Sequence, residues 1–490
     1  MELLKRASLV GVVMSARRLL SARGLNVSRG TRIVLSGIDF NLVEGEIVAL
    51  IGENGSGKST LLETLAGLHP MSSGYVKRHD LGEPKLIRDS EGSRGNIAGF
   101  GLTLQSDGIC GEETVKERID SALKISGVIA SDDDIESILS QWGLEHRAKD
   151  NVSQLSDGLR RRVAVLAGLM PAAMQSEPTV VLLDEPSEGL DKASRDLLAT
   201  WLRALSLRGN SIVIATHDSQ MISVADRLLS FDSNGSLNSS QGESLGEISI
   251  LPSPAKKFDA SRFFEFINWS WRMEKRNPID TVGRATPALV AMLLAFTLVG
   301  QIDIPQTSSL STHVGNDLIA GLVLAPAFIT AIVAPALIKR LAEERAGDWW
   351  RAMTGANSRA MFSIGGASFI LPIPIMYLSW FVIAGDIDSS TNDEVLKWLW
   401  LPALSVIDIS AAAAALHLMV SDLNRSSAAA GSLLLLVLIW PFLELTSALS
   451  TIMESGMTFE LSIGEPLSDI LISSFSAILV WGVAVIIPED

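Results

Sequence analysis

A glycine-rich loop carries the most specific chemical signal in this 490-residue sequence. The apolar run 47–51 leads straight into GENGSGKST at 52–60 and then into a segment with helical apolar spacing, so strand, G-x-x-x-x-G-K-[ST] and helix follow one another. In such a loop, backbone N–H groups surround the β-phosphate of a nucleotide, the lysine reaches the β- and γ-phosphates, and the hydroxyl ligates Mg²⁺. We therefore predict that ATP binds through Gly52, Asn54, Gly55, Ser56, Gly57, Lys58, Ser59 and Thr60.

Two adjacent carboxylates follow another apolar run, VVLL at 180–183. Asp184 stands at the end of this predicted strand, where it can hold Mg²⁺ through water, and Glu185 can orient and polarise the attacking water as a general base. A solvated acidic strand end would not require four apolar residues before the pair. The motif therefore predicts ATP hydrolysis, with Ser59 and Asp184 as metal ligands and Glu185 as a catalytic residue.

Further motifs occur in a definite order along the first half of the chain. Gln105 follows an apolar segment, the sequence LSDGL contains Ser156 and Gly158, and His217 follows an apolar run. Together these motifs resemble the ATPase domain of ABC transporters over about the first 235 residues. The resemblance implies an α/β P-loop NTPase fold, with Gln105 as a contact of Mg²⁺ and of the membrane domain. It also implies that His217 is catalytic at the γ-phosphate, and that Ser156 and Gly158 bind the γ-phosphate held by the opposite subunit.

Two positions depart from the pattern of this family. Leu159 stands where the signature LSGGQ has glutamine, which removes an amide from the composite site and puts its efficiency in question. Arg29 falls near the position of the aromatic residue that stacks on adenine in related proteins. Its planar guanidinium can still stack on a base, so we expect loose selectivity for the base.

The composition indicates that part of the chain lies in a membrane. Hydrophobic residues make up 47% and charged residues 19%, with a mean hydropathy of +0.31, which is too apolar for an ordinary soluble enzyme. The net charge of -15 argues against nucleic-acid binding, because phosphate contacts need a basic surface. The single cysteine, Cys110, excludes a disulfide framework and every multi-cysteine metal signature.

Six windows of about 20 mostly apolar residues are long enough to cross the hydrocarbon core as helices. All tryptophans except Trp142 and Trp201 lie beyond residue 255, as expected where aromatic belts mark membrane interfaces. We therefore expect an all-α membrane domain of six transmembrane helices, at 286–300, 317–338, 360–384, 396–420, 428–449 and 467–487.

Basic residues indicate how these spans are oriented. They gather before the first span, between spans two and three and between spans four and five, whereas the alternate loops contain only Lys397. By the positive-inside rule the basic set is cytoplasmic, so we expect a multi-pass protein of the plasma membrane with its ATPase domain and both termini in the cytoplasm. The outer loops are short, which predicts that no large extracellular domain is present.

Polar and amphipathic segments define the remaining boundaries. Residues 236–258 are rich in serine and glycine, which predicts a linker. The next segment is expected to be an amphipathic helix in the membrane interface, with Phe263, Phe266, Ile267 and Trp271 on one face. The predicted parts are an N-terminal extension (1–19), an ABC ATP-binding domain (20–235), the linker (236–258), the interfacial helix (259–284) and the membrane domain (285–490).

Two features of the second half have alternative interpretations. Asp408, His417 and Glu444 fall inside predicted spans, where polar groups either line a pathway or hydrogen-bond within the protein. The pair Trp349-Trp350 falls in the basic segment from Lys339 to Arg359. Related exporters dock a coupling helix on the ATPase at this place, but an aromatic anchor held by lipid headgroups fits the pair nearly as well.

The whole chain resembles an ABC half-transporter of the exporter type. This resemblance implies a homodimer or pairing with a homologous half-transporter, because each ATP site lies between two subunits. Residues 20–40 and 61–76 are most similar to the ATPase subunit of the cytochrome c maturation haem-exporter system, and the short-looped spans resemble its membrane subunit. We therefore expect an exporter of an amphipathic or hydrophobic substrate, haem-related by this likeness. The alternative is an ABC-type ATPase that acts as a mechanical or regulatory membrane complex without translocation.

Overall fold

The chain folds into two compact units that are not continuous in sequence. The computed structural model describes residues 17–79, 84–95, 99–232, 235–257, 261–299, 309–355, 358–366, 369–383, 389–422 and 436–487. One unit comprises Met1–Glu265 together with Leu341–Ala356, and the other comprises Phe266–Arg340 together with Asn357–Asp490. The short segment Leu341–Ala356 therefore lies between two membrane helices in the chain but belongs to the first unit.

A mostly parallel sheet forms the centre of the first unit. Its strand order is β11-β10-β3-β9-β8-β6, and only β11 runs antiparallel to its neighbour. Because the carboxyl ends of parallel strands meet at one edge of a sheet, the loops that follow these strands come together there. The strands are β3 (Ile47–Ile51), β6 (Gly101–Thr103), β8 (Val180–Asp184), β9 (Ser211–Ala215), β10 (Arg227–Phe231) and β11 (Leu237–Gln241).

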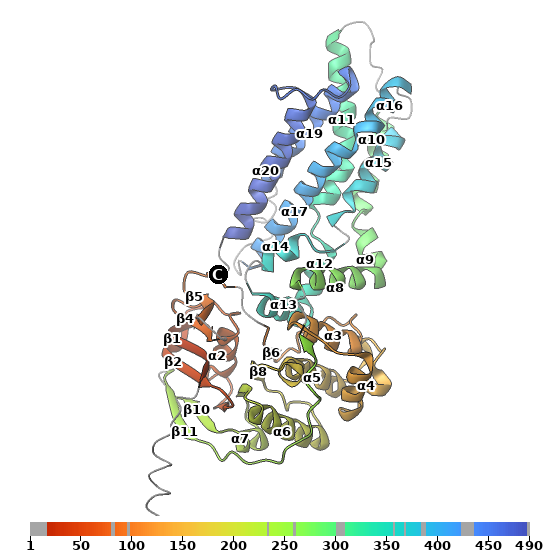
Figure 1. The fold of residues 1–490 in the computed structure, drawn as a ribbon. Coiled ribbons are helices and arrows are strands. Elements are labelled where there is room, and N and C mark those ends of the chain that lie inside the picture. The colour runs from red at the N-terminus through yellow and green to blue at the C-terminus, as the bar shows by residue number, and fades with distance from the viewer. Residues whose placement is uncertain are drawn as a thin grey trace, which may run out of the picture. The chain divides into compact units, whose positions relative to one another are not determined.

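A smaller antiparallel sheet and several helices complete the first unit (Figure 1). The sheet has the order β2-β1-β4-β5, with β1 (Arg18–Arg29), β2 (Arg32–Val43), β4 (Ser73–His79) and β5 (Pro84–Asp89). The helices are α2 (Lys58–Leu65), α3 (Val115–Ile125), α4 (Asp132–Gln141), α5 (Asp157–Met174), α6 (Lys192–Leu207) and α7 (Ser219–Ser223). Most of the predicted N-terminal extension, residues 1–16, lies outside the described residues, and β1 begins within its last residues.

The predicted linker contains strands, which the composition did not indicate. β11 pairs with β10, and β12 (Lys256–Lys257) pairs with β7 (Val128–Ile129). Between them, the Arg208 guanidinium donates hydrogen bonds to the carbonyl oxygens of Leu251 and Pro252. A strand can be added to an existing sheet edge by backbone hydrogen bonds alone, so its side chains need not be apolar. The ATP-binding fold therefore extends beyond residue 235.

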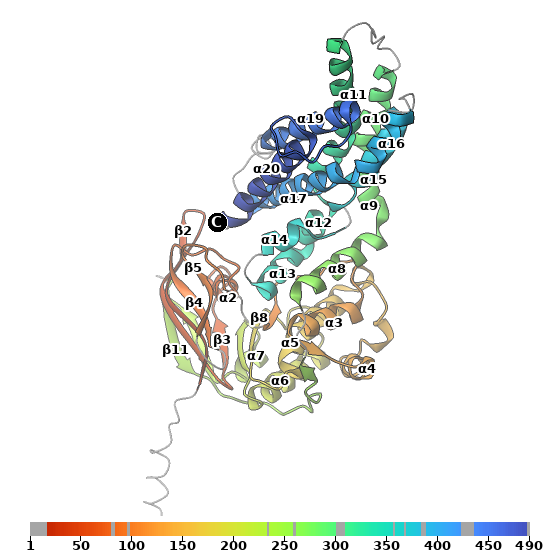
Figure 2. The ribbon, with the colours of Figure 1, turned by 45° about the horizontal axis from the view of Figure 1, so that its top comes forward.

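The second unit is helical (Figure 2). Within the described residues, five helical segments are long and apolar enough to cross a membrane. Small and aliphatic side chains from α10, α11, α15, α17, α19 and α20 form its buried core. The helices are α8 (Arg262–Arg276), α9 (Pro278–Gly283), α10 (Thr286–Val299), α11 (Ser309–Ile332), α12 (Ala336–Ala342), α14 (Ser358–Ser363), α15 (Pro372–Ile383), α16 (Ser389–Trp398), α17 (Trp400–Asp422), α19 (Ile439–Ser455) and α20 (Pro466–Ile486).

The third predicted span, 360–384, is wrong as a continuous helix. The structure divides it into α14 and the shorter apolar helix α15. Gly365 and Gly366 lie in the break, and Gly366 has a φ of 90°. A Cβ atom at Gly365 would lie 2.5 Å from the Phe266 ring, and one at Gly366 would lie 2.7 Å from a Glu274 carboxylate oxygen. Glycine is therefore required at both positions for α8 to pack this closely against the break. Mean hydropathy does not detect this requirement.

Three other predicted spans have different boundaries in the structure. The window 317–338 contains most of α11, which runs from Ser309 to Ile332, and the start of α12. The window 396–420 contains the end of α16 and most of α17, which are separated at Leu399. The window 428–449 begins outside the described residues, and α19 continues beyond it to Ser455. These differences arise because helix ends are set by local backbone geometry, whereas hydropathy windows report only composition.

The apolar face predicted for the interfacial helix is divided in the structure between buried and exposed side chains. In α8, Phe266, Trp269 and Met273 are buried, and Phe266 packs against Phe362 with their ring centroids 5.0 Å apart. Phe263 and Trp271, which the prediction placed on the same face as Phe266, are exposed. The spacing i, i+3, i+7 of the buried residues shows that protein packing uses a stripe next to the predicted one.

One intramembrane polar group has a clear packing partner. The Nε2 atom of His417 lies 2.9 Å from the carbonyl oxygen of Ile332, the last residue of α11. The last carbonyls of a helix have no partner within the helix, so this contact satisfies one of them. The geometry favours the hydrogen-bonding interpretation for His417.

Candidate nucleotide site

Three glycines shape the loop between β3 and α2. Gly52, Gly55 and Gly57 have φ values of 146°, 81° and 111°, which L side chains rarely adopt. The Lys58 ammonium group is nearly buried and donates hydrogen bonds to the carbonyl oxygens of Gly52 (2.7 Å) and Glu53 (3.1 Å). The lysine is therefore held across the mouth of the loop, where a phosphate chain would lie.

A cavity of about 400 Å³ opens at this loop. It brings together six of the eight predicted loop residues, all but Gly52 and Ser56, with Gln105 from the segment after β6 and Glu185 from the end of β8. It also includes two arginines from the β1–β2 turn. Its lining residues are Arg29, Arg32, Val34, Asn54, Gly55, Gly57, Lys58, Ser59, Thr60, Gln105 and Glu185.

The oxygen atoms near Ser59 suit a magnesium ion. The Ser59 hydroxyl donates a hydrogen bond to Asp184 Oδ1 (3.0 Å), and Asp184 Oδ2 is buried without a hydrogen-bond partner among the described residues. Burial raises the pKa of Asp184 to about 6. A hydroxyl and a carboxylate with a spare buried oxygen are the hard ligands that Mg²⁺ prefers, together with nucleotide phosphates. Ser59 and Asp184 would hold the ion, which would polarise the phosphates when bound.

Glu185 and His217 lie side by side. His217 Nδ1 is 3.0 Å from Glu185 Oε2, and this carboxylate raises the pKa of His217. Glu185 is buried and has a φ of 44°, a left-handed conformation that costs about 1–3 kcal/mol in a residue other than glycine. Glu185 lines the cavity, where its carboxylate can accept a proton from water.

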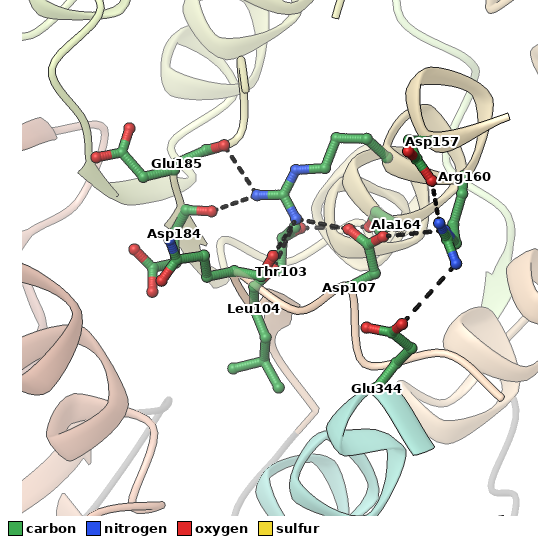
Figure 3. Close-up of polar contacts among 11 residues, drawn as sticks. Thr103, Leu104, Asp107, Asp157, Arg160, Ala164, Asp184, Glu185 and Glu344 are labelled. Atoms are coloured by element: carbon green, nitrogen blue, oxygen red, sulfur yellow. Dashed lines mark hydrogen bonds and ion pairs between the residues drawn. The ribbon is translucent and has the colours of Figure 1, made fainter. Parts of the chain in front are cut away.

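Arg161 is an important residue that the sequence analysis did not identify. This nearly buried side chain on α5 donates hydrogen bonds to the carbonyl oxygens of Asp184 and Glu185 and to that of Leu104 (Figure 3). It also bonds Asp107 Oδ1 at 2.7 Å, and Asp107 has a φ of 62°. The Arg161 guanidinium thus holds Asp107, on the loop after β6, and Glu185, on the loop after β8, in left-handed conformations. The three consecutive arginines after the LSDGL motif were the sequence feature that could have indicated this role.

The two predicted signature residues do not line the cavity within one chain. Ser156 is exposed at the N-terminal end of α5, and Gly158 lies in its first turn. A Cβ atom at Gly158 would lie 2.9 Å from the Gly189 carbonyl oxygen, so glycine is required there for packing. A role for these two residues at a γ-phosphate needs a second chain.

A segment from between the membrane helices packs on the first unit. We call Glu343–Thr354, which contains α13 (Ala346–Thr354), the docked segment. The Gly108 N–H donates to the Glu344 carbonyl oxygen (3.0 Å), and the Gly111 N–H donates to Glu343 Oε1 (3.3 Å). These contacts join the docked segment to the loop that begins at Gln105. Arg160 adds an ion pair with the Glu344 carboxylate at 3.8 Å (Figure 3).

The tryptophan pair of the docked segment is packed against protein. Trp349 and Trp350 are 1% and 0% exposed. The Arg118 guanidinium of α3 lies 3.6 Å from the centroid of the Trp349 ring, in a cation–π contact. This burial contradicts the alternative of an aromatic anchor among lipid headgroups.

Comparisons with known proteins identify the relatives of the first unit. A family model described as "ABC transporter" matches residues 35–188. HrtA of Staphylococcus saprophyticus subsp. saprophyticus, an ATP-binding protein named for hemin import, is 32% identical over 41% of this chain and 88% of its own length. MacB of Azoarcus sp., a macrolide export ATP-binding/permease protein, is 33% identical over 40% of this chain and 29% of its own length.

Other matches have similar coverage. SmoE of Agrobacterium fabrum, a sulfoquinovosyl glycerol transport ATP-binding protein, is 33% identical over 43% of this chain. The match spans 56% of SmoE, so this chain covers about half of that relative's length. A solved ATP-binding subunit of an ABC transporter aligns with a TM-score of 0.38 at 22% identity, over 46% of this chain and 90% of its own.

Proposed function

This chain belongs to the ABC transporter family, and from that premise we propose that it is an ATP-driven half-transporter of the exporter type. The chain carries an ABC transporter ATP-binding domain, the domain that couples ATP hydrolysis to transport in this family. ATP and Mg²⁺ would occupy the cavity at Lys58, and Glu185 would deprotonate the attacking water. His217 and Gln105 would contact the γ-phosphate and the metal ion, respectively.

The site is proposed to be complete only when two chains meet. Ser156 and Gly158 do not line the cavity of their own chain, which supports a composite site with the signature of a second subunit. Either another copy of this chain or a homologous half-transporter would supply it. Each of the two sites would then hold one ATP between Lys58 of one subunit and Ser156 of its partner.

The docked segment is the observation that supports coupling to transport. It lies between α12 and α14 in the chain, yet it packs on the ATP-binding unit beside the loop that begins at Gln105. A change in that loop on ATP binding would therefore move a segment that is covalently continuous with the membrane helices. A soluble ATPase has no membrane helices to which such a segment could be joined.

The membrane helices support a multi-pass protein with the ATP-binding unit on the cytoplasmic side. We propose that the chain crosses the membrane a sixth time at α15, which returns both termini to the cytoplasm. The substrate is proposed to be amphipathic or hydrophobic. A haem-related substrate is the finer proposal, supported by the likeness of residues 20–40 to a haem-exporter ATPase subunit and by the match to HrtA.

Disrupting the docked segment is expected to uncouple ATP hydrolysis from transport. Trp350→Ala removes a fully buried ring, at a typical cost of about 3–5 kcal/mol, and should detach the segment without touching a phosphate ligand. Reconstituted protein should still bind ATP, with a loss of affinity of no more than about fivefold, and should keep basal turnover but lose stimulation of the ATPase by lipids, drugs or haem. Glu344→Ala should act in the same direction more weakly.

The control for this experiment is Glu145→Ala, which removes an exposed carboxylate elsewhere on the same unit. It should retain the stimulation of the parent protein. If Trp350→Ala and Glu344→Ala both retain full stimulation, the coupling role of the docked segment is excluded.

The proposed orientation predicts which residues can be labelled from outside the cell. Cys110 is the native thiol and is buried, so single cysteines can be introduced in a Cys110→Ser background. Asp393 and Lys339 are both exposed and lie in an outer and an inner loop of the proposed topology. An impermeant maleimide on intact cells should label Asp393→Cys, whereas Lys339→Cys should react only after permeabilisation. The reverse pattern would contradict the orientation.

A further inference from the structure

Glu63 on α2 is shared by two arginines from distant parts of the chain. Its Oε2 atom accepts a hydrogen bond from Arg29 at 2.8 Å, and its Oε1 atom accepts one from Arg345. Arg29 lines the nucleotide cavity, and Arg345 begins the docked segment's helix as the N-cap of α13. The Glu63 side chain is only 6% exposed. A nearly buried carboxylate therefore joins the nucleotide cavity directly to the docked segment.

The two arginines differ in how firmly they are held. Arg345 also donates to Asp348 Oδ2 at 2.6 Å, and Asp348 pairs with Arg351 at 3.6 Å, so Arg345 belongs to a network within the docked segment. The Arg29 side chain is 52% exposed, and its ion pair in the described part of the chain is the one with Glu63. Arg29 is therefore the partner that a ligand in the cavity can most easily attract.

The docked segment is held in an unfavourable backbone conformation. Glu344 and Arg345 are consecutive residues with φ values of 45° and 58°, which residues other than glycine adopt only when their surroundings impose it. The contacts made by Glu343, Glu344 and Arg345 to the first unit maintain this conformation. Weakening one of these contacts should favour release of the docked segment. A segment that can be released in this way has two states, docked and released.

We propose that Glu63 transmits occupancy of the nucleotide cavity to the docked segment. The negative charge of bound ATP draws Arg29 away from Glu63, which leaves the whole carboxylate to Arg345. A carboxylate that no longer divides its charge between two cations attracts the remaining one more strongly. ATP binding thus tightens the docked segment on the ATP-binding unit. This inference rests on the proposed function, because it takes ATP as the ligand of the cavity.

The single native thiol provides a reporter of docking. Cys110 is fully buried, and its Sγ atom lies 3.6 Å from Glu343 Oε2, so reaction with a maleimide requires the docked segment to open. The measurement is the rate of Cys110 modification with and without MgATP, in full-length protein carrying Glu185→Gln to prevent turnover. We expect ATP to slow the reaction about fivefold, at the low end of typical allosteric coupling.

Substitutions in the network separate this mechanism from others. In Glu63→Gln protein, ATP should no longer slow the reaction of Cys110. In Arg29→Gln protein, the reaction should already be slow without ATP. The matched control is Arg23→Gln, which removes a half-exposed arginine of β1 that pairs with Asp39 at 3.1 Å and does not line the cavity; it should leave the effect of ATP intact.

A reciprocal measurement keeps the proposal testable if a variant is less stable. The coupling free energy between two sites is the same in both directions. Arg345→Gln should therefore weaken ATP binding about fivefold when it is introduced into the parent protein. It should not weaken ATP binding when it is introduced into Glu63→Gln protein. Equal slowing of Cys110 by ATP in the parent and in Glu63→Gln protein would overturn the role of Glu63. If the parent binds no ATP at all, the proposed function itself fails. Circular dichroism melting shows whether each variant is folded.

Discussion

Glu185→Gln is expected to abolish ATP hydrolysis and to leave ATP binding intact. The substitution keeps the shape of the side chain but removes the base that accepts a proton from water, while Lys58 and the loop glycines still bind phosphate. General bases contribute about 10²–10⁴-fold to a rate, so turnover should fall at least about a hundredfold. Phosphate release and nucleotide titration measure the two effects separately. Size-exclusion chromatography with ATP should also show a trapped dimer.

Lys58→Ala is the contrasting variant for this experiment. It removes the ammonium group that bridges the loop carbonyls of Gly52 and Glu53, and it should lose ATP binding as well as turnover. Near-wild-type phosphate release by purified Glu185→Gln protein would exclude Glu185 as the base. The two variants together distinguish a failure of chemistry from a failure of binding.

Arg161→Met is expected to reduce the turnover number about a hundredfold with little change in ATP affinity. Arg161 does not line the nucleotide cavity, but it holds the main chain of Glu185 and the loop at Asp107. Methionine keeps much of the side-chain volume and removes the hydrogen bonds, so both loops can relax from their left-handed conformations. A displacement of about 1 Å in a catalytic group can cost about 10²-fold in rate.

A neighbouring arginine provides the matched control. Arg162 donates a hydrogen bond to the Trp142 carbonyl oxygen and pairs with Asp191 at 3.4 Å, away from the ends of β6 and β8. Arg162→Met should therefore retain turnover within a few-fold of the parent. Arg161→Met should also lower the melting temperature, because it leaves buried acceptors unsatisfied at about 1–3 kcal/mol each. An unchanged turnover number in Arg161→Met would exclude its positioning role.

Local motifs were sufficient to predict the core of the nucleotide site. The loop at 52–60 combines glycines with a lysine and hydroxyls within nine consecutive residues, and each requirement of phosphate binding is met by neighbours in sequence. The pair Asp184 and Glu185 follows a buried strand for the same local reason. The convergence of the loop and Glu185 with Gln105 in one cavity follows from the parallel strands, whose carboxyl ends share an edge.

Hydropathy was a less complete guide to the helices. It indicated the five described helical segments that are long and apolar enough to cross a membrane, because crossing depends on composition over about 20 residues. It did not detect the break at Gly365 and Gly366, because the need for glycine there comes from the approach of Phe266 and Glu274. The strands β11 and β12 were also missed, because they depend on pairing with β10 and β7.

By itself, the sequence was enough to predict a nucleotide site and a membrane part, since both predictions rest on residues close together in the chain. Only the tertiary structure decided how the two are joined. Arg161 acquires its role because α5 brings it to the ends of two strands. Glu63 and Arg345 are separated by 282 residues and meet because the docked segment folds back onto the first unit. Such pairings depend on long-range packing of the backbone, which no local pattern of residue types specifies.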